Sequence, residues 1–287
     1  MIEFFDALGA NTLLRHALLA GIIASVACGI VGSYVVTRRI TYIAGGVAHC
    51  ILGGMGAARY LHTVQGWTWL EPLHGAVVAA VAAALTIGLV SLRAREREDT
   101  VISALWAIGM AVGILFIART PGYYEDLMSY LFGNILLVSR ENLILIGGLD
   151  IMVVAVGLLF YNKFLAVCFD EEFARLRGVS VEFYYLLLLC LTALTVVVLV
   201  TVVGLVLVIA LLTLPVAVAG HFASRLWQMM LLATMISAAL TTVGLAISYG
   251  PELPPGATTI ALAGGMYLAV IGGKWLLAGR RRTARSA

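Results

Sequence analysis

Charged side chains are scarce in this 287-residue chain. Asp, Glu, Lys and Arg make up only 11% of it, whereas 62% of the residues are hydrophobic. A soluble domain carries roughly 25% charged residues and about 45–50% apolar ones. Because so few polar groups cannot cover the whole molecule in water, lipid must supply part of its surroundings. The composition therefore excludes an ordinary soluble domain.

Three further features are absent. Strands that alternate apolar and polar residues are missing, so a β-barrel is disfavoured and the long apolar segments are expected to be helices. C-x-x-C spacing is missing too, so the four dispersed cysteines are expected to be packing residues rather than a metal centre. The first thirteen residues lack a basic start and include Glu3 and Asp6, which predicts no cleaved signal peptide.

Hydropathy and charge breaks predict about nine membrane spans in a single domain that covers residues 1–287. The expected fold is an all-α, polytopic transmembrane bundle. One uncharged stretch, Phe183–Ser224, is 42 residues long. It is twice as long as one span, so it must fold back near Thr201–Gly204 and form the sixth and seventh helices. The other predicted spans are Leu14–Val36, Ile40–Leu61, Leu73–Leu92, Val101–Ala118, Leu143–Tyr161, Met229–Tyr249 and Thr258–Leu277.

Basic residues predict the orientation of the bundle. With nine spans, most Lys and Arg residues between spans fall on one side, which the positive-inside rule makes cytoplasmic. The N-terminus is then outside and the C-terminus is cytoplasmic, and Arg119 and Arg140 are the main exceptions. The predicted cytoplasmic residues are Arg38, Arg39, Arg93, Arg95, Arg97, Lys163, Arg175, Arg177, Arg225 and the tail Arg280–Arg285.

Two other segments have distinctive compositions. The segment from Arg119 to Asn142 is too charged and too short for a free span, and such a segment is tolerated at membrane depth only against protein or a cavity. We therefore expect an outer, partly re-entrant or interfacial helical piece there. The second predicted span is rich in glycine, which predicts close contact with neighbouring helices. Its glycines are Gly45, Gly46, Gly53, Gly54 and Gly56.

A short polar segment on the predicted cytoplasmic side has the signals of a capped helix, about 169–179. Asp170 suits the N-cap, Glu171 and Glu172 suit the first turn, Arg175 suits the last turn, and Gly178 suits the stop. By these signals alone the segment is a surface helix between two spans, either a plain connector or a docking element.

Four segments in order resemble the ABC-type permeases for zinc, manganese and iron. The capped segment Phe169–Gly178 is similar to that family's coupling helix, F-D-P-E-x-A-x-x-x-G, with Glu171 in place of the proline. The other three are Gly32–Val36 followed by Arg38-Arg39, Leu131–Leu136 followed by Val138-Ser139, and Gly204–Ala219 with its Leu214-Pro215 step.

The resemblance implies a multi-pass protein of the cytoplasmic (inner) membrane that is a transporter subunit and not an enzyme. It implies a homodimer with a second permease copy, two ATP-binding subunits and an external metal-binding protein as partners, and no nucleic acid. The chain lacks a G-x-x-x-x-G-K-[ST] phosphate loop, since Gly272-Gly273-Lys274-Trp275 has neither the earlier glycine nor the hydroxyl residue. ATP hydrolysis is therefore expected on a separate chain, and no permanently bound cofactor is expected.

Two ionisable residues stand out because they lie well inside predicted spans, where such residues are costly and usually face the bundle interior. His49 lies in the second span and Asp150 in the fifth. Imidazole and carboxylate are ordinary ligands of zinc and manganese, so a pathway site for a divalent metal is one interpretation. The alternative is a hydrogen-bonded core histidine and a paired or capping aspartate.

The resemblance favours the pathway role for His49. The family motif G-D-A-x-S-H-A is similar to Ala44–Cys50, but Gly45 stands at the position of its aspartate. One carboxylate is thus missing, and Asp150 is our candidate substitute. His16, His62 and His74 fall at the predicted outer ends of three spans, where they could form a mouth that receives metal, or could be ordinary interfacial histidines.

Two other functions compete with a divalent-metal permease. An ion-coupled secondary transporter would need its own coupling site and ideally inverted repeats with broken helices. The sequence shows no convincing repeat and offers Asp150 as the one candidate ion site. An ABC permease for a larger metal chelate is the second alternative, and the short chain and His49 argue against it.

Overall fold

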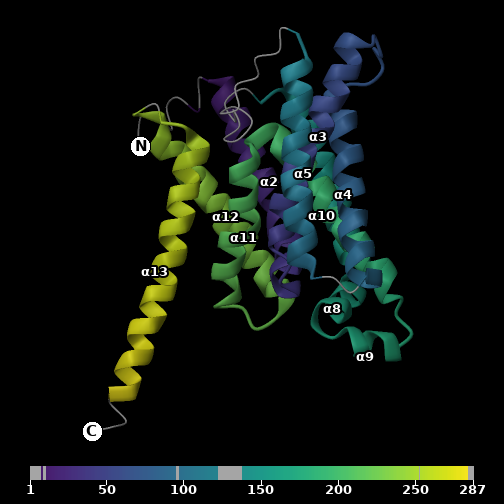
Figure 1. Cartoon of the computed structure of the whole chain (residues 1–287). Coiled ribbons are helices and arrows are strands. Elements are labelled where there is room, and N and C mark those ends of the chain that lie inside the picture. The colour runs from purple at the N-terminus through teal and green to yellow at the C-terminus, as the bar shows by residue number, and fades with distance from the viewer. Residues whose placement is uncertain (1–7, 9–10, 95–96, 122–137, 252, 284–287) are drawn as a thin grey trace.

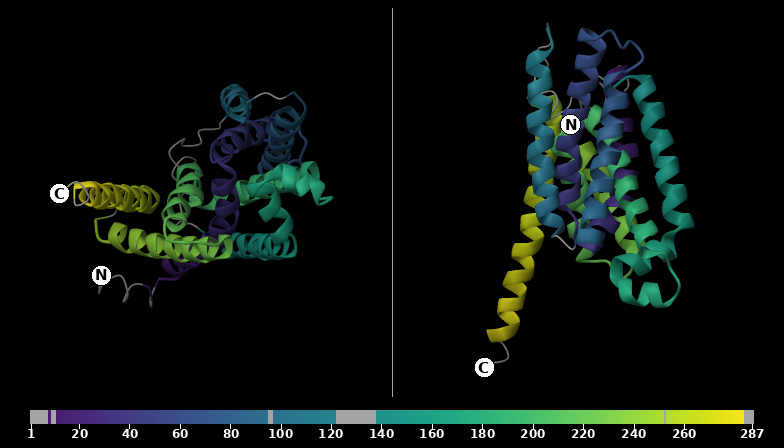
Figure 2. Two further views of the ribbon diagram at one scale, coloured as in Figure 1. Left: turned by 90° about the horizontal axis from the view of Figure 1, so that it is seen from below. Right: turned by 45° about the vertical axis from the view of Figure 1, so that its right-hand side comes forward.

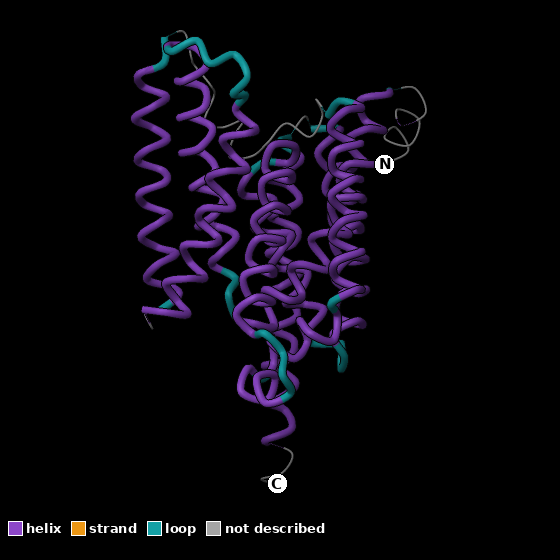
Figure 3. Tube along the Cα trace, turned by 90° about the vertical axis from the view of Figure 1, so that its right-hand side faces the viewer, coloured by secondary structure: helices purple, strands orange, loops and turns teal. Residues whose placement is uncertain are grey.

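The structure is a computed structural model and shows a bundle of helices (Figure 1). It describes residues 8, 11–94, 97–121, 138–251 and 253–283. Within these residues the chain forms helices and loops but no strand, as the tube in Figure 3 shows. The prediction of an all-α fold is therefore confirmed. The helices are α2 (Thr12–Arg38), α3 (Tyr42–Val64), α4 (Pro72–Ala94), α5 (Glu98–Arg119), α7 (Arg140–Leu159), α8 (Tyr161–Phe169), α9 (Glu171–Leu176), α10 (Val181–Val203), α11 (Leu205–Gly220), α12 (Leu226–Tyr249) and α13 (Pro255–Thr283).

Seven of the described helices are long and apolar enough to cross a membrane, namely α2, α4, α5, α7, α10, α12 and α13. α11 is apolar but only 16 residues long. α3 carries His49, Arg59, His62 and several glycines, which lower its hydropathy. The nine predicted spans correspond in position to these nine helices. Length and composition support seven of them, so the count of nine and the orientation of the termini stay predictions.

α2 lies at the centre of the bundle, as the view along the helices in Figure 2 shows. It packs against α7, α10, α11 and α12. Its fully buried positions are mostly small, among them Ala17, Ala20, Ala24 and Ala27. Small side chains let helix backbones approach closely, which matters in lipid because association there depends on van der Waals packing. The composition of α2 therefore explains its central place.

α3 packs between α4 and α5 through its glycines. A methyl group at Gly53 would lie 2.8 Å from the carbonyl oxygen of Gly109 on α5. On another face, a methyl group at Gly54 would collide with the carbonyl oxygen of Gly75 on α4. Neither contact leaves room for a side chain. The prediction that the second span makes close helix contacts is confirmed.

The break between α10 and α11 falls at Gly204, within the predicted bend. Gly204 has φ 86° and ψ 158°, a backbone conformation that only glycine adopts readily. Figure 1 shows α11 running back toward the end of the bundle where α10 begins. The uncharged stretch thus folds into two helices. Residues 122–137, and with them most of the predicted interfacial piece between Arg119 and Asn142, lie outside the described residues.

Candidate functional site

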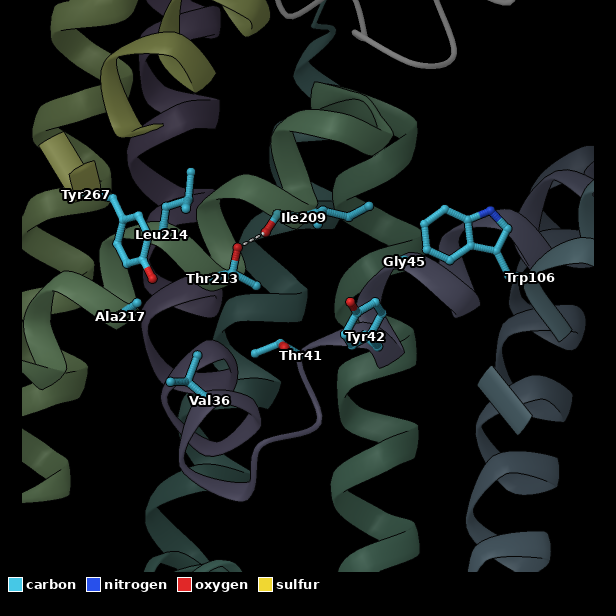
Figure 4. A pocket seen from close by; sticks show the side chains of 10 residues that line it. All are labelled: Val36, Thr41, Tyr42, Gly45, Trp106, Ile209, Thr213, Leu214, Ala217 and Tyr267. Atoms are coloured by element: carbon cyan, nitrogen blue, oxygen red, sulfur yellow. Dashed lines mark hydrogen bonds between the residues drawn. The ribbon is translucent and has the colours of Figure 1, made fainter. Parts of the chain in front are cut away.

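A cavity of about 430 Å³ lies between α3 and α5 on one side and α11 and α13 on the other (Figure 4). Trp106 of α5 and Tyr267 of α13 face it from opposite sides. The hydroxyl group of Thr213 also reaches it and donates a hydrogen bond to the carbonyl oxygen of Ile209 at 2.8 Å. The wall is otherwise mostly apolar. The lining residues are Val36, Thr41, Tyr42, Gly45, Trp106, Ile209, Thr213, Leu214, Ala217 and Tyr267.

The predicted pathway histidine lies directly behind this wall. His49 is 7% exposed, and its imidazole stacks on the indole of Trp106 with ring centroids 4.4 Å apart and an interplanar angle of 20°. The Nδ1 atom of His49 is buried and has no hydrogen-bond partner among the described residues. Buried polar atoms are normally paired. An unpaired imidazole nitrogen beside a cavity is therefore a group with free capacity for a ligand.

Gly45 explains why Trp106 can lie where it does. Gly45 precedes His49 by four residues, so both occupy one face of α3. A Cβ atom at Gly45 would come within 2.9 Å of the Cζ3 atom of Trp106. The indole therefore occupies the space that a side chain at position 45 would need. The missing carboxylate noted in the sequence is replaced here by an aromatic ring.

Asp150 lies on α7 and contacts α2. Its side chain is buried, and its Oδ1 atom accepts a hydrogen bond from the backbone N–H of Ala27 at 3.1 Å. Its Oδ2 atom is buried without a hydrogen-bond partner in the part of the chain that the structure describes. His49 instead contacts α5, so the two predicted pathway residues face different helices. Their joint role in binding metal stays a prediction.

The three histidines of the predicted outer mouth lie at the start of α2, the end of α3 and the start of α4. The Nδ1 atom of His16 is 3.2 Å from the carbonyl oxygen of Val138. His74 accepts a hydrogen bond from the backbone N–H of Glu71 at 3.2 Å. The Nδ1 atom of His62 is buried and unpaired with respect to the described residues. In the described part of the chain, no group of three or more His, Cys, Asp or Glu side chains is placed so that it could hold a metal ion.

The predicted capped helix is present as α9. The side chain of Asp170 accepts a hydrogen bond from the backbone N–H of Phe173 at 2.9 Å, which is an N-cap. Glu171 and Glu172 occupy the first turn, and Arg175 occupies the last. Gly178 has φ 73° and follows the helix end. The local structure of this segment is therefore confirmed, whereas its role in docking is a proposal.

α9 and the end of α8 expose large apolar side chains. Phe169 is 67% exposed, Phe173 is 50% exposed and Leu176 is 87% exposed. The helix lies at one end of the bundle, beyond the adjoining ends of α4 and α5, although α13 extends further in the same direction (Figure 1). Grouped apolar side chains on a surface of this kind mark contact with another protein or with lipid.

Sequence reasoning missed two contacts at these places. The first is the stacking of His49 on Trp106, for which the glycine face of α3 was a usable signal because it required a close neighbour. The second is an ion pair between Arg38 at the end of α2 and Glu171 of α9. No spacing rule connects residues so far apart in the sequence.

Comparisons with known proteins agree with this architecture. The model of the ABC 3 transport family matches residues 10–273. The "Probable metal transport system membrane protein" of Chlamydia trachomatis is 42% identical over 255 residues, which cover 89% of this chain and 87% of that protein. The manganese transport system membrane protein MntC of Halalkalibacterium halodurans is 33% identical over 264 residues, which cover 92% and 88% of the two chains.

A solved structure has the same fold. A chain of PsaBC from Streptococcus pneumoniae in complex with Fab superposes with a TM-score of 0.81 and 29% sequence identity. The match covers 94% of this chain and 95% of that chain.

Proposed function

The chain belongs to the ABC 3 transport family, and we propose that it forms the membrane pathway of an ATP-driven importer for a divalent metal ion, with manganese as the favoured cargo. The family match confirms the resemblance to metal-ion ABC permeases that the sequence motifs indicated. The chain is thus a membrane transport component and a multi-pass protein of the cytoplasmic membrane, not itself an enzyme.

The observation that carries the cargo proposal is the similarity to relatives named for manganese transport. One such relative is 33% identical over 92% of this chain, which supports a common architecture and a related cargo. Zinc and iron remain competing cargoes because imidazole and carboxylate ligands also bind them. The metal is a transported ion that the protein releases, so a site of moderate affinity is sufficient.

The proposed pathway passes the cavity beside His49. That cavity lies among α3, α5, α11 and α13. His49, whose Nδ1 atom has no hydrogen-bond partner among the described residues, stacks on Trp106, which lines the cavity. Trp106 would then separate the imidazole from the cavity, and rotation of the indole would expose the imidazole to the cavity. Asp150 is proposed as a second polar group of the pathway, reached through movement of α2 against α7.

The proposed orientation places α9 in the cytoplasm. The C-terminal end of α2 lies at the same end of the bundle as α8 and α9 (Figure 1). These segments and the residues that flank them carry Arg38, Arg39, Lys163, Arg175 and Arg177. The positive-inside rule makes that end cytoplasmic. The exposed apolar residues of α8 and α9 then face the compartment in which ATP-hydrolysing subunits work.

The proposed partners follow from this arrangement and from the family. The exposed face of α9 would dock one of two ATP-binding subunits, and a second copy of this chain would complete the pathway. An external metal-binding protein would deliver the ion at the end that carries His16, His62 and His74. These assemblies are proposals for this chain.

The decisive experiment is uptake of radiolabelled manganese by the chain reconstituted with its ATP-binding subunit. We expect ATP-dependent uptake that His49→Ala reduces at least tenfold, about 1.4 kcal/mol of lost stabilisation at the rate-limiting step. His221→Ala is the matched control, since His221 is exposed and its side chain lies outside the cavity wall. Unchanged uptake in His49→Ala would remove that residue from the pathway.

Three further arms separate the alternatives. Zinc, iron and a metal chelate replace manganese in turn. Faster uptake of one of them would replace manganese as the proposed cargo and leave the proposed permease role unchanged. Uptake that continues without the ATP-binding subunit and follows an ion gradient would instead identify a secondary transporter.

A further inference from the structure

A polar network joins α9 to the rest of the bundle. Its members are Glu171, Arg38, Tyr185, Glu98 and Ser91. Glu171 of α9 forms an ion pair with Arg38 at the end of α2. The guanidinium of Arg38 lies over the ring of Tyr185 on α10, 5.3 Å from its centroid.

The network continues from α10 to the hairpin of α4 and α5. The hydroxyl group of Tyr185 donates a hydrogen bond to Oε1 of Glu98 at 2.8 Å. The hydroxyl group of Ser91 donates to the same oxygen at 3.0 Å. Five helices, α9, α2, α10, α5 and α4, are thus linked by one continuous chain of side-chain contacts.

The surroundings make these contacts stronger than ordinary surface pairs. The side chains of Arg38 and Glu171 are only 22% and 30% exposed, and Tyr185 is 1% exposed. Partial burial reduces screening by water, and hydrogen bonds to charged groups are stronger than neutral ones. A shift of α9 would therefore pull on α2 through Arg38 instead of being absorbed by loose surface side chains.

Arg38 also has capacity for a second arrangement. Its Nε atom is buried without a hydrogen-bond partner among the residues that the structure describes. An unpaired buried donor atom in a partly buried guanidinium is a cost in this conformation. Bringing an acceptor to that donor would require a different position of α9 or α10, and coupling between distant sites requires an element that changes between two discrete arrangements.

We propose that Arg38 is the positioning residue that transmits movement of α9 to the pathway helices. Through Glu171 it follows α9, and through Tyr185 and Glu98 it moves the hairpin of α4 and α5, which carries Trp106. The inference rests on the proposed function, because it assumes that an ATP-hydrolysing subunit moves α9. It adds a named route by which that movement reaches the cavity.

The test measures ATP hydrolysed per manganese ion taken up by the reconstituted complex. Arg38→Gln and Glu171→Gln are each expected to raise this ratio about fivefold or more, the lower range of measured couplings between sites. The double variant is expected to be no worse than either single variant, because both break the same contact. Arg38→Lys keeps the charge and is expected to restore part of the coupling.

A second pair of variants tests the far end of the network. Tyr185→Phe keeps the buried ring beneath Arg38 and removes only the hydroxyl group that binds Glu98, and it should raise the ratio in the same direction. Tyr184→Phe is the matched control on the neighbouring residue. Arg39→Gln is the matched control for Arg38→Gln, since Arg39 is exposed. Both controls should behave as the wild type.

The outcomes are distinct. Additive effects of Arg38→Gln and Glu171→Gln, or equal behaviour of Tyr185→Phe and Tyr184→Phe, would overturn the proposed route while wild-type uptake stands. Loss of coupling that always accompanies a matching drop in the melting temperature of the complex would show a structural role and overturn it as well. A wild-type complex without ATP-driven uptake would overturn the proposed function itself.

Discussion

The imidazole of His49 and the indole of Trp106 stack face to face, 4.4 Å apart, at the edge of the cavity that α3 and α5 share with α11 and α13. The contact is possible because Gly45, one turn before His49, leaves the ring the space it needs. In this chain an aromatic ring and a glycine therefore occupy the place where the family motif supplies a carboxylate. The aromatic lining that Trp106 gives this side of the cavity depends on that exchange.

Gly45→Asp should destabilise the protein, because its Cβ atom would meet the indole of Trp106 at 2.9 Å. Overpacking of this kind typically costs about 1–3 kcal/mol. The double variant Gly45→Asp with Trp106→Ala removes the clash and should recover part of the melting temperature. Thermal unfolding in detergent measures both. A double variant less stable than Gly45→Asp alone would contradict the conclusion that a side chain at position 45 and the indole of Trp106 need the same space.

Gly54→Ala should weaken the packing of α3 on α4, because the added methyl group collides with the backbone of Gly75. Gly148→Ala on α7 is the matched control, since open space surrounds that position. Alanine favours a helix over glycine by about 1 kcal/mol, so the control should be neutral or stabilising. The melting temperature should fall in Gly54→Ala and should stay unchanged or rise in Gly148→Ala, and equal shifts would count against the close α3–α4 contact.

Asp150→Asn should leave the melting temperature unchanged or raise it. The amide oxygen can still accept the hydrogen bond from the N–H of Ala27, while the carboxylate with one unpaired buried oxygen is removed. Reduced manganese uptake by a protein of normal stability would support a pathway role for Asp150. A melting temperature several degrees lower would show instead that the carboxylate holds α7 on α2.

Leu176→Cys should react rapidly with a membrane-impermeant maleimide added from the cytoplasmic side, because Leu176 is 87% exposed on α9. The native Cys168 is an internal negative control. Burial raises the pKa of the Cys168 thiol to about 12, so almost none of it is thiolate at pH 8, and little of its surface is accessible. Labelling of Leu176→Cys only from outside would reverse the proposed orientation.

Sequence alone determined the class of the molecule and much of its local structure. The scarcity of charge required lipid, the long apolar runs required helices, and the 42-residue run required the break found at Gly204. The caps of α9 were also readable, because capping depends on side chains within a few residues of the helix end. Four short motifs were enough to indicate the family.

Only the tertiary structure decided which side chains meet. Trp106 covers His49, Asp150 contacts α2, and Arg38 binds Glu171 because helices far apart in sequence lie side by side. Spacing along one helix predicts which face a residue occupies, but it does not predict which neighbour packs there, since the backbone of every helix is already satisfied internally. The choice of neighbour depends on how well two helix surfaces fit together, as Trp106 fits against Gly45. That fit involves side chains of both helices, so the sequence of one helix does not determine it.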